Sequence, residues 1–222
     1  MQHRESGNTH VRMGTRMRGA LADAYGTRGR SHAELTYAYS AKTGKDVVLR
    51  TSLEYGHFLL CEALPEIDSV DYGANASSGN EEPAFDAVVT FATGELQGRF
   101  IRAESESNLS FEIERLNPKP FVVMTEQEIY RNPVLIRNWN RVVPYLAQVR
   151  DVPLQNYIRS VAALIKSERI VSLRKVLNMG AADESAFYAA AAFRAEQKGI
   201  LYSDLDSLPL SLNTQFGNGS SN

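Results

Sequence analysis

Three carboxylates in the first half of the chain stand where a helix start and two strands can bring them together. Glu54 lies in the first turn of an expected helix, Asp86 begins a run of strand-forming residues, and Glu104 follows Arg102 by two positions at the end of the next run. Oxygen ligands of this kind suit Mg²⁺ and Mn²⁺. Such ions activate water and neutralise charge during phosphodiester hydrolysis. The pattern therefore indicates a metal-dependent nuclease centre with Glu54, Asp86 and Glu104 as ligands.

The two strands that carry Asp86, Arg102 and Glu104 are expected to form an antiparallel hairpin. Two runs of β-branched and aromatic residues flank a turn at Thr93 and Gly94, over residues 85–91 and 96–103. This turn places Asp86 opposite Arg102 or its neighbour on the return strand. Because side chains alternate along a strand, Arg102 and Glu104 are expected on one face together.

Further elements surround this hairpin in the sequence. Thr51 followed three residues later by Glu54 has the pattern of a capping box, which predicts a helix that ends at Pro65. Strands over 67–72 and 121–124 and a helix over 108–116 complete the order of elements. This order predicts an α/β domain over residues 31–130.

From residue 131 onward the pattern is mostly helical. Apolar spacing predicts four helices, over 133–149, 153–166, 169–178 and 183–198. Asp183 is the expected N-cap of the last helix and Gly199 its C-cap. Two extended pieces follow, over 200–205 and 208–212. Three helices and a small hairpin are typical of a winged helix, so we expect such a domain over residues 131–215 and a disordered tail over 216–222.

Charge is distributed unevenly along the 222 residues. Residues 1–50 carry nine basic and four acidic side chains, whereas residues 51–118 carry three basic and thirteen acidic ones. Residues 1–30 have little periodic apolar content and are expected to form a basic flexible arm that follows phosphates or docks on partners. The acidic block fits a metal site on a nucleic-acid enzyme, and it equally fits a solvated acidic surface.

Composition excludes several classes of protein. With 43% hydrophobic residues the chain can bury a substantial core, which excludes an intrinsically disordered protein. Its apolar runs are much shorter than a membrane span, so we expect no membrane anchor. No apolar stretch follows the N-terminal arginines as it would in a secretory signal. Cys61 is the single cysteine and cannot form a disulfide framework, which predicts a reducing cytoplasm.

Four blocks of the sequence resemble those of TnsA, the endonuclease subunit of heteromeric cut-and-paste transposases: residues 50–54, 68–72, 85–89 and 121–129. In that family a buried strand runs directly into Thr-Glu-x-Glu-Ile, as Phe121–Met124 runs into Thr125–Ile129 here. A proline and an asparagine follow, as Pro133 and Asn138 do in this chain. The resemblance extends over roughly residues 31–215.

The resemblance implies a restriction-endonuclease-like N-terminal domain followed by a mostly α winged-helix C-terminal domain. It implies a Mg²⁺- or Mn²⁺-dependent enzyme that cuts the 5′ strands at transposon ends, while a DDE-type transposase subunit cuts and joins the 3′ ends. A TnsC-like AAA+ ATPase is then the regulator that links the complex to target DNA. Glu54 matches the family's helix glutamate and Asp86 its metal-binding aspartate. The implied location is the bacterial cytoplasm, on the nucleoid when the complex is active.

The return strand departs from the family pattern. The family has an acid or glutamine, one further residue and then a lysine, whereas this chain reads Arg102-Ala103-Glu104. A lysine can position or deprotonate the attacking water, but an arginine stays protonated and stabilises only negative charge. Gln97-Gly98-Arg99 repeats the order of residue types, yet it follows Asp86 too closely and lies near the turn. We therefore assign Arg102 and Glu104 to the catalytic set, with Glu104 as the third metal ligand.

Other interpretations of the same residues stay open. The chain can be a catalytically degenerate scaffold between transposase and ATPase, or a winged-helix DNA-binding regulator. Glu54 can close its capping box on the Thr51 amide, and Arg102 with Glu104 can form a surface ion pair. Three other residues of reactive or aromatic type are expected to pack in the core: His57, Cys61 and Trp139.

Deleting residues 1–30 tests whether the basic arm binds DNA. We expect the plot of log affinity against log salt concentration to become shallower, because fewer counterions are released when fewer phosphates are neutralised. Fluorescence anisotropy with a labelled duplex measures this slope for the full chain and the deletion. An unchanged slope would show that the arm serves protein contacts.

Overall fold

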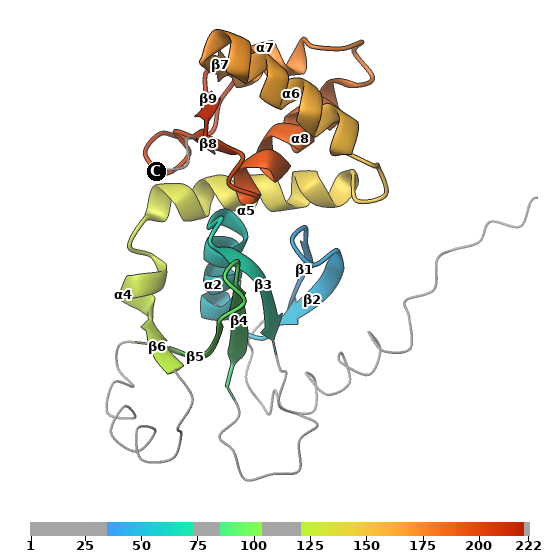
Figure 1. The fold of residues 1–222 in the computed structure, drawn as a ribbon. Helices are drawn as coiled ribbons and strands as arrows, with labels where there is room; N and C mark the ends of the chain where they lie inside the picture. Colours follow the sequence, from blue (N-terminus) through green and yellow to red (C-terminus); the bar gives the residue numbers. More distant parts are fainter. Residues whose placement is uncertain (1–34, 73–84, 104–120, 220–222) are drawn as a thin grey trace, which may run out of the picture.

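The computed structural model describes residues 35–72, 85–103 and 121–219 (Figure 1). The described chain has an α/β architecture. A four-stranded sheet and a small hairpin lie on one side of the long helix α5 (Pro133–Gln148). The helices α6 (Gln155–Glu168), α7 (Leu173–Leu177) and α8 (Ser185–Gln197) lie on its other side with a three-stranded sheet. Among the described helices, none is long and apolar enough to cross a membrane.

The larger sheet follows the order expected from the sequence. Helix α2 (Ser52–Ala63) is followed by the strands β3 (Ile67–Tyr72), β4 (Ala87–Phe91), β5 (Leu96–Arg102) and β6 (Phe121–Thr125). The spatial order is β3-β4-β5-β6, in which the first three strands are antiparallel and β6 runs parallel to β5. The helix expected over 108–116 lies outside the described residues. A separate hairpin, β1 (Thr36–Ser40) and β2 (Lys45–Leu49), precedes α2.

The β4–β5 hairpin turns where the sequence predicts it. Gly94 has φ +86°, a left-handed conformation that glycine adopts without steric cost. The register pairs Ala87 with Arg99 and Thr90 with Leu96. Asp86 stands just outside this ladder, and its N–H donates to the Arg99 carbonyl at 3.0 Å. The hairpin therefore brings the end of β5 to Asp86.

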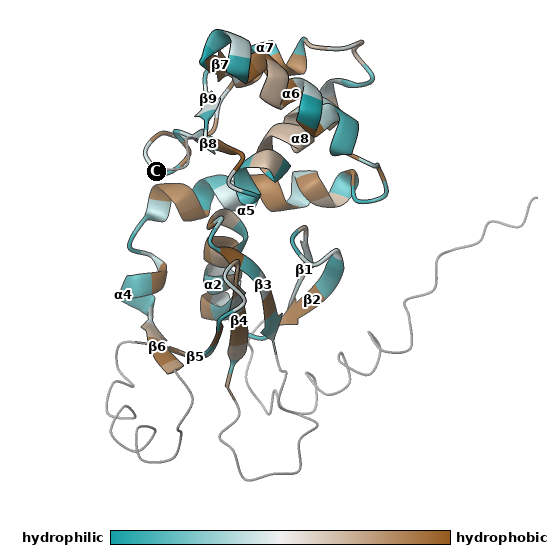
Figure 2. Cartoon of the chain, in the orientation of Figure 1, coloured by the Kyte–Doolittle hydropathy of each residue, from teal (hydrophilic) through white to brown (hydrophobic). Residues whose placement is uncertain are grey.

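The block Thr-Glu-x-Glu-Ile has a structural role at the end of β6. Thr125 caps the short helix α4 (Glu126–Ile129), and its hydroxyl accepts from the Glu128 N–H at 3.3 Å. The Glu128 carboxylate accepts in return from the Thr125 N–H at 2.8 Å, which closes a capping box. Figure 2 shows the consequence as a hydrophobic β6 followed by a hydrophilic α4. This block thus marks a strand-to-helix junction.

The C-terminal part differs from expectation in three places. Residues 169–178 do not form one helix: α6 (Gln155–Glu168) ends at Arg169, whose φ is +71°, and β7 (Ile170–Ser172) precedes the short helix α7 (Leu173–Leu177). Helix α8 (Ser185–Gln197) has Glu184 at its N-cap position, not Asp183, and Glu184 makes no side-chain cap bond. Gly199 follows the helix with φ +67°, as its predicted role at the helix end requires.

The third difference concerns the end of the chain. The extended piece expected over 208–212 is absent; β8 (Leu201–Ser203) pairs instead with β9 (Gln215–Asn218). Strand β9 also pairs with β7 and is the central strand of the β7-β9-β8 sheet. Phe216 is fully buried. Its polar neighbours are typical of a disordered tail, but packing of the phenylalanine keeps this segment in the fold. The folded C-terminal part thus extends beyond the predicted boundary at residue 215.

One continuous core joins the two sides of α5. Trp139 and Val142 of α5 are fully buried, and the same cluster contains Phe58 of α2. The alanines of α8 over 189–192 are also buried in it. Small side chains let helices approach closely, and α8 contacts α2, α5, α6 and α7. Trp139 and the alanine run therefore act in packing, as the sequence predicts.

A buried polar contact also crosses between the two sides. The carboxylate of Glu62, near the end of α2, accepts from the Ser40 hydroxyl at 2.6 Å, the Ala41 N–H at 3.1 Å and the Gln197 amide at 2.8 Å. Gln197 in turn accepts from Arg194 at 2.6 Å. Burial raises the pKa of Glu62, while the bonds from Ser40 and Gln197 lower it. We name Glu62, Ser40 and Gln197 the glutamate junction.

Replacing Gln197 with alanine tests the energetic role of the glutamate junction. We expect Gln197→Ala to lower the free energy of unfolding by about 2 kcal/mol, because a buried carboxylate loses a donor and Arg194 loses its acceptor. Urea denaturation measures the change. Gln148→Ala, at the exposed end of α5, is the matched control and should stay close to the parent. Equal stability of the two variants would contradict the prediction.

Candidate active site

Glu54 is held at the first turn of α2 by its own backbone and by Arg50. Its N–H donates to the Thr51 hydroxyl at 3.0 Å, which caps the helix. Its carboxylate accepts from the Arg50 N–H at 2.6 Å and forms an ion pair with Arg50 Nε at 3.4 Å. The alternative in which Glu54 reaches the Thr51 amide is thus wrong, because the carboxylate reaches back one residue further. Arg50 is a site residue without an assigned role in the sequence analysis, although it belongs to the block 50–54 and precedes Glu54 by four residues.

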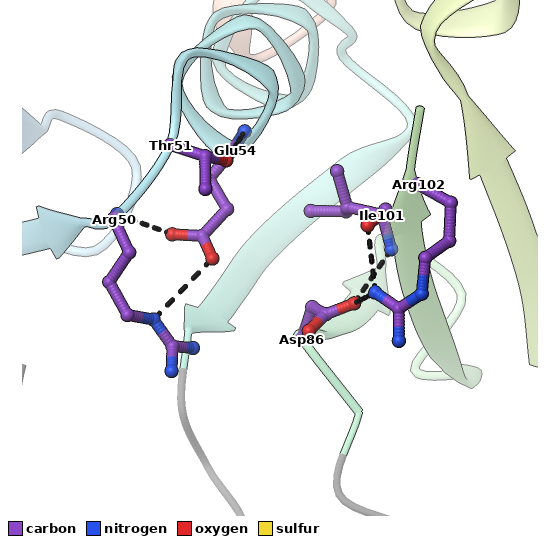
Figure 3. A network of polar contacts seen from close by, with 6 residues as sticks. All are labelled: Arg50, Thr51, Glu54, Asp86, Ile101 and Arg102. Carbon is purple, nitrogen blue, oxygen red and sulfur yellow. Dashed lines mark hydrogen bonds and ion pairs between the residues drawn. The ribbon is translucent and has the colours of Figure 1, made fainter. Parts of the chain in front are cut away.

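Asp86 is held at the end of β5. Its Oδ2 accepts from the Ile101 N–H at 2.8 Å and pairs with the Arg102 guanidinium. Arg102 also donates to the Ile101 carbonyl at 2.8 Å and lies 5.4 Å from the centroid of the Phe100 ring. Figure 3 shows Asp86 turned toward Arg102 while Glu54 is turned toward Arg50. The structure therefore brings Asp86 and Arg102 together, although the register differs from expectation: Ala87 pairs with Arg99, so Asp86 lies one to two residues short of the expected position and reaches Arg102 through its side chain.

The two carboxylates approach from different elements. Ala87 and Ile101 pack with Leu53 of α2, whereas Phe100 packs with Phe85 on the other face of the sheet. Side chains alternate along β5, so Arg102 lies on the same face of the sheet as Phe100 and packs over its ring. This face is opposite to the one that α2 covers. Glu54 and Asp86 therefore approach the end of the sheet from different sides, and each carboxylate is turned toward its own arginine (Figure 3).

Electrostatics couple the two carboxylates. Burial raises the pKa of Glu54, the bond and charge of Arg50 lower it, and the negative charge of Asp86 raises it further. Each carboxylate is thus paired with an arginine, and Glu54 still senses the charge of Asp86. A cation between them would relieve this repulsion.

The donor set can be compared with the needs of a metal ion. Glu104 lies outside the described residues, and within them no group of three or more His, Cys, Asp or Glu side chains could hold a metal. Mg²⁺ is commonly held by one or two carboxylates and completes its shell with waters and substrate phosphates. Glu54 and Asp86 fit that smaller requirement. An incoming ion would compete with Arg50 and Arg102 for the same carboxylates.

A polar hollow of about 840 Å³ lies along α4, lined by residues 126–128, Tyr130 and Arg131. It is close to the site in the fold, because Thr125 at the start of α4 pairs with Arg102 and the Tyr130 hydroxyl donates to the Ser52 carbonyl at 3.3 Å. The hollow therefore lies beside the end of the sheet that carries the candidate site, on the side of α4.

The neighbouring histidine belongs to the core. His57 is fully buried; its Nδ1 lies 2.7 Å from the Tyr72 hydroxyl and its Nε2 lies 3.1 Å from Arg99. Burial, followed by the charge of Arg99, lowers the pKa of His57 to about 3. The ring is therefore neutral at physiological pH and cannot exchange protons with a substrate. Cys61 lies beside it, fully enclosed, and burial raises its pKa to about 12.

Arg99 does not replace the missing lysine. Its side chain is buried and contacts His57 and Cys61 under α2, and its Nε donates to Gln97 at 3.1 Å. The expectation that Arg99 lies too near the turn is wrong, because Arg99 pairs with Ala87 and its carbonyl accepts from the Asp86 N–H. The direction of its side chain, toward His57 and Cys61, separates it from the Asp86 carboxylate.

Comparison with known proteins adds no name to this site. No protein-family model matches the chain, and no curated protein sequence matches it either.

Glu54→Gln tests the electrostatic state of the site. Burial favours the protonated form of Glu54 in the folded chain, so its charge lowers stability above the raised pKa. We expect the variant to have an equal or higher Tm than the parent at pH 7.5, with the gap shrinking as pH falls and Glu54 takes up a proton. Thermal denaturation over this pH range measures the effect. Glu66→Gln, on an exposed side chain, is the control, and a clearly lower Tm of Glu54→Gln at pH 7.5 would contradict the argument.

Proposed function

We propose that this chain is the DNA endonuclease subunit of a heteromeric transposase and cuts the 5′ strands at transposon ends. The single observation that carries the proposal is the closeness of two carboxylates at one end of the sheet: the charge of Asp86 acts on Glu54, and Asp86 pairs with Arg102. Hydrolysis of a phosphodiester needs carboxylates that hold a cation and a positive group that neutralises the phosphate charge. These residue types stand together here.

The fold supports the same proposal. A helix, an antiparallel three-strand meander and a fourth strand parallel to the third form the order that a restriction-endonuclease-like domain implies. The carboxylates lie at the start of α2 and the start of β4, where the resemblance to TnsA puts them. In the C-terminal part, three helices interleaved with the strands of a small sheet support a winged-helix domain.

The residues of the chain divide the chemistry between them. Glu54 and Asp86 would hold Mg²⁺ or Mn²⁺, which when bound supplies an activated water and neutralises phosphate charge. Arg102 stays protonated, so it stabilises negative charge on the phosphate and does not accept a proton. Arg50 balances the charge of Glu54 before the ion arrives. Glu104 is the proposed third ligand.

A second candidate function is supported by the arginine pairing itself. Glu54 and Asp86 each already have an arginine partner, and Arg102 lies where the family pattern has no arginine. A site stabilised in this way need not bind metal. The chain would then be a scaffold that bridges a DDE-type transposase and a TnsC-like AAA+ ATPase without cutting DNA.

The arrangement of α8 argues against the third function, a DNA-reading regulator. In helix-turn-helix domains the recognition helix lies in the major groove with its side chains on the bases. The alanines of α8 and Phe193 are instead buried in the core, and α8 lies between α5 and the other C-terminal helices (Figure 1). This helix cannot enter a groove while the core is intact. The C-terminal part is better suited to protein contacts.

Cleavage of transposon-end DNA separates the two candidates. In a complex reconstituted with transposase and ATPase, we expect nicking of the 5′ strands with Mg²⁺ or Mn²⁺ and none with chelator. Asp86→Asn should reduce nicking by at least about 100-fold, because the ion loses a charged ligand. Asp68→Asn, at an exposed position of β3, is the matched control.

Further variants refine the outcome. Arg102→Lys should retain or raise activity, because a desolvated lysine can lose its proton. Normal assembly of the complex without nicking by the parent chain would favour the scaffold. Nicking by Asp86→Asn at the parent rate would remove Asp86 from the site.

A further inference from the structure

A groove of about 270 Å³ lies where the end of α5, the start of α6, strand β1 and the end of α8 meet. Its apolar lining comes from both sides of the α5–α6 connection: Leu146, Val149, Val152, Leu154 and Ile158. Three cationic side chains line the same groove: Arg150, Arg194 and Lys198. It lies apart from Glu54 and Asp86, which are not among its lining residues.

The cations differ in how far the chain neutralises them. Arg150 pairs with Asp46 at 3.4 Å and lies 5.9 Å from the Tyr39 ring centroid, so it is held in place. Arg194 is half-buried and donates to the neutral Gln197 amide at 2.6 Å. Within the described part of the chain, neither Arg194 nor Lys198 forms an ion pair with a carboxylate. Arg194 still feels the charge of Glu62, with which it shares Gln197, whereas Lys198 is exposed and is the least neutralised cation of the groove.

The start of α6 adds to this charge. Leu154 occupies the N-cap position and provides no side-chain bond to the first N–H groups of the helix. The positive end of the helix dipole therefore borders the groove, because Pro153, Leu154 and Gln155 line it. Two sources of positive potential thus face one apolar floor.

We propose that this groove binds an acidic segment of a partner protein, with an aliphatic or aromatic side chain on the floor and carboxylates on Arg194 and Lys198. The volume suits one or two side chains, and the floor requires an apolar group to replace water. A nucleic-acid backbone would present phosphates but nothing to cover the aliphatic floor, and a duplex is too wide to enter. The inference does not depend on nuclease activity.

Peptide selection on the full chain tests the proposal. A displayed library of random 12-residue peptides is selected on the parent protein and counter-selected on the double variant Arg194→Gln, Lys198→Gln. We expect enrichment of peptides in which Asp or Glu flanks a large apolar residue. A labelled enriched peptide should bind Lys198→Gln and Arg194→Gln about 10-fold more weakly each, since losing one partly desolvated ion pair costs about one factor of ten.

Arg159→Gln is the matched control, because Arg159 is an exposed arginine of α6 that does not line the groove. It should bind the peptide like the parent. If Arg194→Gln is unstable because it also touches the glutamate junction, Lys198→Gln alone decides, since Lys198 is exposed and has no role there. The proposal is overturned if no peptides are enriched, if neutral or basic peptides are, if Lys198→Gln binds like Arg159→Gln, or if an unlabelled DNA duplex displaces the peptide.

Discussion

Burial of carboxylates on α2 constrains both parts of the molecule. Glu54 stands at the start of this helix and Glu62 near its end, separated by about 12 Å of helix at 1.5 Å per residue. A buried carboxylate must be surrounded by donors or lose its charge. Arg50 provides them for Glu54, while Ser40, Ala41 and Gln197 provide them for Glu62. One helix thereby aligns the candidate site with the C-terminal part.

The two ends of α2 solve the same problem in different ways. Glu62 accepts from neutral donors of two separate segments, residues 40–41 and the end of α8, and this arrangement is suited to holding a structure together. Glu54 is balanced by one flexible arginine and disturbed by Asp86. An arginine side chain can move aside when a cation arrives, whereas a network that spans the core cannot. The contrast explains why the proposed chemistry belongs to the first end and the structural contact to the second.

Local patterns in the sequence predicted the first half well. Thr51 before an apolar helix, Gly94 between two β-branched runs and the strand before Thr125 each act through short-range geometry, and the structure confirms the elements they predict. The hairpin brings the end of β5 beside Asp86, and the Asp86 side chain then spans the small difference from the expected register to reach Arg102. Arg50 was missed because an ion pair with Glu54 leaves no motif of its own, and the Glu62 contact was missed because its partners are distant in sequence.

The failures in the second half have a different cause. Residues 169–178 have helical spacing, but pairing with a distant strand outweighs local propensity for the first few of them. The glycine, asparagine and serine residues around Phe216 suggest disorder, and only tertiary burial of the phenylalanine reveals a strand. Glu104 lies outside the described residues, so its role as third ligand stays a prediction.

The central position of β9 determines the order in which the C-terminal sheet can assemble. Neither outer strand pairs with the other, because Ile170 and Tyr202 both pair with Gly217 between them. During synthesis β7 and β8 therefore cannot pair until the last strand of this sheet is made. The Tyr202 ring then lies over Gly217, where a Cβ would meet the end of the tyrosine side chain. Contacts so distant in sequence are slow to form. Nascent chains of this protein would keep an unpaired strand edge exposed until synthesis has passed residue 218. A chaperone that binds this edge would protect the chain from aggregation during that interval.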